Sequence, residues 1–256
     1  MSVFNPNPTE FPSLWACAWG QDKYGYWQAF KLNDVQQVMR WIPPGVFQMG
    51  SPDNEAERLD NENLHSVTLT QGYWLAETAC SQSLWLAVME DNPSDFSDNL
   101  ENPVNRVSWL DCQRFFTAAN TLLPEGLILR FPTEAEWEYA CRANTQTAFS
   151  WGNGLSIKQA NYDGNFSYHN SEKGEYRQRV VEVLKFSANP WGLYQMHGNV
   201  WEWCEDLYVE NLEEDQVYPL GGTGRWSRVL RGGGWNDFGL DLRSAIRDAG
   251  VPGYRS

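Results

Sequence analysis

Residues 189–206 read NPWGLYQMHGNVWEWCED and residues 228–235 read RVLRGGGW, and these two stretches decide the fold. Neither stretch follows the period of a helix or of a strand. Trp201 and Trp203 flank the carboxylate of Glu202, and a Gly-Asn pair that suits positive φ angles comes shortly before them. The pattern therefore predicts an ordered turn in which packed tryptophans hold Glu202 in a fixed place.

The composition predicts one large domain. The chain has 256 residues, of which 42% are hydrophobic and 14 are tryptophan, so it can bury a sizeable core. Its 19 basic and 33 acidic side chains give a formal net charge of −14, which repels phosphate backbones and anionic lipids. The N-terminus lacks a signal-peptide pattern, and no run is long enough to span a bilayer. We therefore expect a cytoplasmic protein with neither nucleic acid nor membrane as a partner.

The first half of the chain has the patterns of regular secondary structure. Apolar residues alternate in three short stretches, which predicts a β-meander. Two amphipathic patterns predict helices that begin near Ser81 and Ser108, and Thr133 and Glu136 have the capping-box spacing that predicts a third. The expected strands cover residues 36–42, 46–51 and 65–70.

Regular periodicity almost disappears from Trp151 onward, where Gly, Asn, Asp, Tyr and Trp dominate. The second half is therefore expected to be ordered loop held by aromatic anchors. A small sheet with helices on one side and long structured loops on the other is an α+β arrangement. We expect an aromatic-rich N-terminal extension over residues 1–35 and one domain over residues 36–256.

The two opening stretches resemble the signature of the formylglycine-generating enzyme family, also called sulfatase-modifying factors. The resemblance begins at Trp41-Ile-Pro-Pro-Gly-Val-Phe-Gln-Met-Gly-Ser51 and extends to Arg247. It implies the large, loop-rich version of the C-type-lectin-like fold. In one non-catalytic branch of that fold, the variable proteins of diversity-generating retroelements, the framework is Arg-Gly-Gly-x-Trp and Arg-Ser-Ala-x-Arg. Residues 231–235 and 243–247 look like this framework.

The sequence lacks what the oxidase chemistry of this family requires. The resemblance implies two copper-binding cysteines shortly after the Gly-Gly segment, but residues 232–247 contain none, and Asp237 stands close to where the first would fall. Copper(I) takes soft thiolate or thioether ligands, which aspartate cannot replace. We therefore expect no copper and no catalytic residue. The cysteines Cys17, Cys80, Cys112, Cys141 and Cys204 are interpreted as reduced, mostly buried thiols.

Calcium is the metal that the resemblance implies. One site of the family uses a side-chain oxygen, two backbone carbonyls and a glutamate, which carries over to Gln195, Gly198, Val200 and Glu202, and a second site begins at Asn161. Oxygen ligands suit this hard cation. The family has Asp or Asn where this chain has Gln195, so we expect weaker binding. The alternative is that Glu202 only accepts hydrogen bonds from loop amides.

The residues between and beyond the framework positions are mixed in polarity and rich in rings, which is typical of recognition surfaces. We therefore expect a non-catalytic module that binds a protein or a small molecule at its C-terminal surface. The alternatives are an ordinary structural loop, a copper-dependent oxidase of protein cysteine, and a structural subunit of a larger assembly. The expected ligand-binding residues are Trp235, Asn236, Asp237, Phe238, Leu240, Asp241, Asp248 and Tyr254.

The resemblance also implies a closing Gly-Phe-Arg strand that pairs with the N-terminal part of the sheet. The sequence ends instead at Pro252-Gly-Tyr-Arg-Ser256. We therefore expect an open sheet edge. Three explanations are compatible with the sequence: the chain is truncated, its aromatic N-terminal segment covers the edge, or a partner does.

Overall fold

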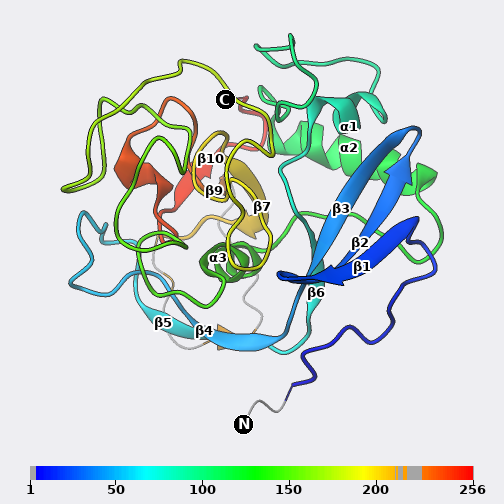
Figure 1. Ribbon diagram of the computed structural model, residues 1–256, viewed down its shortest axis with the longest axis horizontal. Coiled ribbons are helices and arrows are strands. Elements are labelled where there is room, and N and C mark those ends of the chain that lie inside the picture. The colour runs from blue at the N-terminus through cyan, green and yellow to red at the C-terminus, as the bar shows by residue number, and fades with distance from the viewer. Residues whose placement is uncertain (1–3, 211, 213–215, 218–226, 256) are drawn as a thin grey trace.

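The computed structural model describes residues 4–210, 212, 216–217 and 227–255. Strands and short helices alternate with long ordered loops, so the expected α+β class is confirmed. Figure 1 shows helix α3 (Glu134–Arg142) near the middle of the molecule, surrounded by three small sheets. No helix within the described ranges is long and apolar enough to cross a membrane.

The three sheets are small and mostly antiparallel. The first has the order β1-β2-β3-β6, with β1 (Ala18–Asp22), β2 (Gly25–Leu32), β3 (Val35–Ile42) and β6 (Tyr73–Ala76). The second has the order β10-β9-β7, with β7 (Glu202–Leu207), β9 (Arg228–Arg231) and β10 (Asp248–Gly250). The third has the order β4-β5-β8, with β4 (Gly45–Met49), β5 (His65–Leu69) and a parallel partner, β8 (Gln216–Val217).

All three strands expected from alternation are confirmed as β3, β4 and β5. In β5 the side chains of Val67 and Leu69 are buried on one face, as their spacing predicted. The N-terminal segment contributes β1 and β2 to the same sheet, since β2 pairs with β3 along its length. The expected boundary at residue 35 thus falls at the start of β3, and the division into two parts stays a prediction.

The helices begin where their caps predict. Ser81, Ser108 and Thr133 cap α1 (Gln82–Leu86), α2 (Trp109–Leu122) and α3, and both halves of the capping box form at α2 and α3. The helix α1 is short and ends at Leu86. The indole of Trp85 donates to the carbonyl of Asp91, which folds the following residues into turns.

Buried arginines join the C-terminal segment to the rest of the core. Arg231 and Arg243 are fully buried, and the Arg243 guanidinium contacts the carboxylates of Glu62 at 2.6 Å and Glu55 at 2.8 Å. Arg231 forms ion pairs with Glu138 and, at 3.3 Å, with Glu134. Buried charges are tolerated only when they are paired and hydrogen-bonded, so these contacts fix the geometry of the segment.

Helix α3 supplies the carboxylates for two further arginines. Arg247 forms a two-pronged pair with Glu134, at 2.6 and 2.9 Å, and Arg142 binds Glu138 at 2.8 Å. Burial opposes ionisation of Glu138, but the charges of Arg142 and Arg231 outweigh it and lower the pKa of this carboxyl group. The carboxylates of α3 therefore bind the arginines that hold the C-terminal segment in place.

The Arg243 pair gives a direct test of this arrangement. The change Arg243→Met keeps an unbranched side chain but leaves Glu62 and Glu55 buried without their partner. We expect the free energy of unfolding in urea to fall by about 3–5 kcal/mol. The control Lys31→Ala breaks an exposed pair with Asp34 and should cost less than about 1 kcal/mol. Equal losses in the two variants would contradict the structural role of Arg243.

Candidate functional site

The turn before β7 has the backbone that its sequence predicted. Gly198 and Asn199 have φ angles of 90° and 76°, and a Cβ on Gly198 would lie 2.5 Å from the carbonyl oxygen of Asn161. The amide of Gly198 donates to the carbonyl of Gly232 at 2.7 Å, so the two opening stretches lie side by side. The amide of Asn199 donates to the carbonyl of Asn161 at 2.9 Å. This turn therefore joins three distant segments of the chain.

The two tryptophans of the turn are anchored through their indole nitrogens. Trp201 donates to a carboxylate oxygen of Asp237 at 2.6 Å, and Trp203 donates to the carbonyl of Val107 at 3.1 Å. Glu202, between them, accepts a hydrogen bond from the indole of Trp137 at 3.1 Å. Its donor is thus an indole of α3 and not the loop amides considered above. Burial raises the pKa of Glu202 to about 7, although the Trp137 bond lowers it.

The residues considered for calcium are only partly brought together. The Gln195 amide donates to the carbonyl of Glu182 at 2.6 Å and accepts from Asn199. The Asn161 amide donates to the carbonyl of Arg179 at 2.8 Å, and Arg177 lies 3.5 Å from its side-chain oxygen. The Gln195 oxygen already accepts one hydrogen bond, and the charge of Arg177 opposes a cation near Asn161. The arrangement therefore fits calcium poorly.

Other acidic ligands do not compensate for this. No group of three His, Cys, Asp or Glu side chains that could hold a metal ion occurs among the described residues. Of the expected ligands, Val200 and Glu202 line an apolar cavity together. Calcium binding at Gln195, Gly198, Val200, Glu202 and Asn161 stays a prediction.

Two aspartates of the C-terminal segment stabilise its own loop. One carboxylate oxygen of Asp237 accepts from the amide of Gly234 at 2.7 Å and from the Trp201 indole. Asp241 accepts from the amide of Phe238 at 3.0 Å, at the start of the 3-10 helix Gly239–Leu242. Both carboxylates thus hold the loop in shape, a role that the sequence did not indicate.

The rings of this segment remain accessible. Trp235 packs edge-on against Phe96, with ring centroids 5.6 Å apart, and stacks on Tyr176 at 5.9 Å. Phe238 packs against Phe166, with ring centroids 4.3 Å apart, and the two side chains are 45% and 51% exposed. Asn236 is exposed beside them, whereas Leu240 packs partly into the core. The partners Phe96, Phe166 and Tyr176 come from distant loops, and no periodic signal in the sequence marks them.

Asp248 and Tyr254 lie in different surroundings. Asp248 is the first residue of β10 and pairs with Leu230 of β9. Tyr254 follows Pro252, whose carbonyl accepts from Leu110 in the first turn of α2 at 3.1 Å. Both side chains are exposed, but no contact that the structure describes connects them with the rings of the 235–241 loop. Burial raises the pKa of Asp241 in that loop, and the charges of Asp237 and Asp248 add to this effect, so the expected single surface stays a prediction.

The two fully buried thiols, Cys141 and Cys204, show no activation. Burial raises the pKa of Cys141 to about 12 and raises that of Cys204 well above its ordinary value. The Cys141 sulfur lies 3.5 Å from Nε2 of His197, but that nitrogen already accepts from the amide of Ser150 at 3.1 Å. Burial lowers the pKa of His197 to about 4, so the imidazole is neutral and leaves the thiol protonated. Cys17 is exposed.

Comparison with known sequences gives one family. Residues 28–256 match the family described as the sulfatase-modifying factor enzyme 1-like domain. The chain is 38% identical over 199 residues to the formylglycine-generating enzyme of Mus musculus, covering 74% of this chain and 50% of that protein. It is 34% identical over 255 residues to serine/threonine-protein kinase Pkn1 of Chlamydia trachomatis serovar L2, covering 88% and 38%. The chain spans half or less of the length of these relatives.

Solved structures share the fold over most of the chain. Treponema denticola variable protein 1 superimposes with a TM-score of 0.74 and 25% identity, covering 90% of this chain and 95% of that one. PvdO from Pseudomonas aeruginosa superimposes with a TM-score of 0.73 and 24% identity, covering 89% and 93%. The second likeness shows the fold alone.

The raised pKa of Glu202 predicts how stability varies with pH. Glu202 stays protonated in the folded chain up to about pH 7, whereas the unfolded chain releases this proton near 4.5. The stability that the folded chain gains by holding this proton is therefore complete below about pH 4.5 and is lost as pH rises through about 7. The variant Glu202→Gln should gain stability relative to the parent by roughly 1–3 kcal/mol between about pH 5 and pH 8.

Denaturant titrations of both proteins across this range measure the effect. The lowered pKa of His197 makes the folded chain lose stability as pH falls below about 6.5, which is the opposite pH dependence to that of Glu202. His197 is present in both proteins, so its effect cancels in the difference between them. A constant difference between parent and variant would contradict the raised pKa of Glu202.

Proposed function

The chain belongs to the sulfatase-modifying factor enzyme 1-like family, and from this premise we propose that it is a non-catalytic binding module. Its recognition surface is the loop of residues 235–241 with the rings that flank it. The observation that supports this proposal best is the contrast within one segment: Arg231 and Arg243 are fully buried, whereas Asn236 and Phe238 between them are exposed. A rigid support with an exposed, ring-rich loop is the usual construction of a binding surface.

The composition of the loop favours a protein or peptide ligand. Trp235 and Phe238 offer large apolar area at low cost in conformational entropy, and each packs against a second ring. Asn236 adds a donor and an acceptor at the same surface. The likeness to Treponema denticola variable protein 1 supports the proposal, because its chain shares this architecture at 25% identity.

An oxidase acting on protein cysteine is the second candidate, because the mouse formylglycine-generating enzyme is 38% identical over most of this chain. The carboxylate of Asp237 is already bound to the Gly234 amide and the Trp201 indole. No cysteine occurs among the described residues after Cys204. One thiol cannot form a two-thiolate copper site, so the binding function is favoured.

Selection of peptide ligands tests the proposed surface. We expect peptides enriched from a random phage-displayed library to bind the variants Phe238→Ala and Asn236→Ala about tenfold or more weakly, because central rings dominate such interfaces. Purified peptides are titrated against each variant, and thermal unfolding confirms that the variants are folded.

The matched control is Leu122→Ala, which removes an exposed apolar side chain at the end of α2, 56% exposed, far along the chain from the loop. It should bind the same peptides as tightly as the parent. A selection in which no enriched peptide loses affinity in either loop variant would overturn the assignment of this surface.

A further inference from the structure

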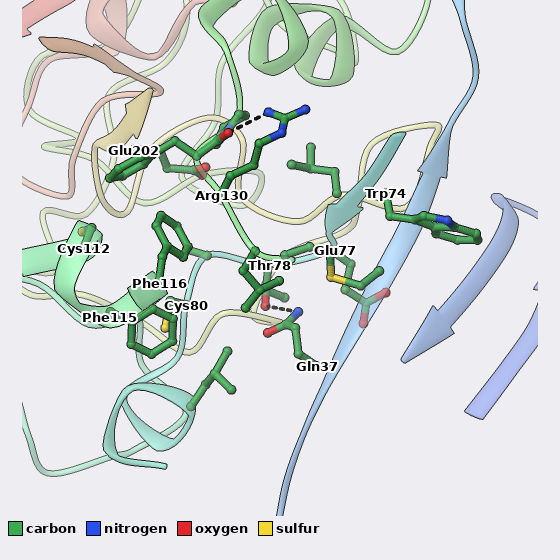
Figure 2. Close-up of a pocket in the computed structure, with 18 of the residues that line it drawn as sticks. Gln37, Trp74, Glu77, Thr78, Cys80, Cys112, Phe115, Phe116, Arg130 and Glu202 are labelled. Carbon is green, nitrogen blue, oxygen red and sulfur yellow. Dashed lines mark hydrogen bonds between the residues drawn. The ribbon is translucent and has the colours of Figure 1, made fainter. Parts of the chain in front are cut away.

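An apolar cavity of about 450 Å³ lies beside β6, between the first sheet, α2 and β7 (Figure 2). Its volume is within the range of ordinary ligand sites. Apolar side chains form most of its wall, and the rings among them include Trp15, Phe30, Trp74, Phe115, Phe116 and Trp203. The exposed rings of the 235–241 loop are not part of its lining, so this cavity is a separate feature.

The cavity follows the edge of β6 and not one of its faces. Residues 73–80 all line it in unbroken succession. A cavity over one face of a sheet would be lined by every second residue, because side chains alternate between faces. Among the described strands β6 pairs with β3 alone, so its other edge faces this space.

The hydrogen-bond pattern shows which backbone groups point to the cavity. The amide of Glu77 donates to the carbonyl of Val38 at 3.0 Å, which continues the antiparallel register of Ala76 with Met39. In such a ladder alternate residues bond to the same neighbour. The N–H and C=O groups of Ala76, and of Trp74 two residues earlier, therefore point away from β3. An exposed row of this kind is a template for one more strand.

A carboxylate completes the cavity. Glu202 lines it together with Trp203, and the one hydrogen bond to its carboxylate that the structure describes comes from Trp137. A cationic side chain at this point would stabilise the ionised form, and burial makes such a pair selective for the correct charge. The formal net charge of −14 also favours a basic occupant.

The N-terminal aromatic segment does not fill this space. Phe11 and Trp15 pack on Trp74, with ring centroids 6.2 and 6.4 Å away, so this segment covers the strand from one side. Trp15 itself is part of the cavity wall. The N-terminal segment therefore forms part of the cavity wall, and the edge of β6 and the carboxylate of Glu202 still border the cavity.

We propose that the cavity receives an extended segment of a partner polypeptide, which pairs with β6 as an added strand, buries apolar side chains among the rings and places an arginine or lysine at Glu202. A small apolar amine could satisfy the carboxylate and the rings, but only a polypeptide backbone also satisfies the N–H and C=O groups of Trp74 and Ala76. Strand addition therefore accounts for all three features.

Synthetic peptides test this proposal on the intact chain. The probes are acetylated eight-residue peptides that alternate Phe or Leu with Thr and carry one arginine, moved stepwise along the sequence. Tryptophan fluorescence titration should show one preferred arginine position. At that position, replacing arginine with citrulline should weaken binding about tenfold or more in the parent and far less in Glu202→Gln.

Backbone methylation tests the pairing with β6. Two versions of the best peptide are made, one with N-methyl groups on the odd-numbered residues and one with them on the even-numbered residues. One version should not bind, and the other should bind within about threefold of the unmodified peptide, because only alternate amides face β6. Equal effects in both versions, or an arginine preference that is unchanged in Glu202→Gln, would overturn the proposal. Equally tight binding of phenethylamine would identify a small-molecule site and would overturn it as well.

The variant Phe238→Ala separates this site from the recognition loop. It should bind the best peptide as the parent does. Loss of peptide binding in this variant, with no loss in Glu202→Gln, would show that the peptide occupies the 235–241 loop and would contradict the β6 site.

Discussion

The pairing of buried guanidinium groups with buried carboxylates is the constraint on which the C-terminal half depends. Arg231, Arg243 and Arg247 all lie in the core and all find partners on α3 or on the loop before β5. A charge removed from water is stable only with its partner in place, so each pair admits few alternative geometries. The segment that contains these arginines has little regular structure, and the ion pairs supply the order that hydrogen-bonded ladders supply elsewhere.

In this arrangement some residues of the C-terminal segment anchor it in the core and others are exposed to solvent. The framework arginines point into the core, and the residues between them form a loop whose turns are closed by Asp237 and Asp241. The rings of Trp235 and Phe238 are then presented from a rigid base. Trp201 connects the loop to β7 through Asp237, and the next residue, Glu202, belongs to the apolar cavity. Trp201 itself lines the cavity as well, so this turn joins the recognition loop to the cavity.

Local signals in the sequence predicted the local structure well. The capping box at Thr133 and the alternation of β5 each depend on neighbours within a few residues, and both are present in the structure. The strands β7, β9 and β10 were wrongly expected to be loop. They are short and are stabilised by pairing with other segments, which leaves no periodic pattern in the sequence. The neighbours of Trp235 were missed for the same reason, since Phe96 and Tyr176 come from loops far away in the chain. The C-terminal surface was predicted as one site; no described contact joins Asp248 or Tyr254 to the rings, but the charge of Asp248 acts on Asp241 of the loop, so the single site stays a prediction.

The proposed function is binding without oxidation, and it is supported by the bonds of Asp237 within the loop and by the dispersed positions of the described cysteines. An oxidation assay with a cysteine-containing peptide, oxygen and added copper tests this most directly. The account predicts no formylglycine beyond that formed by copper alone. Repeated turnover above that background, abolished when one cysteine of the chain is replaced by serine, would contradict it.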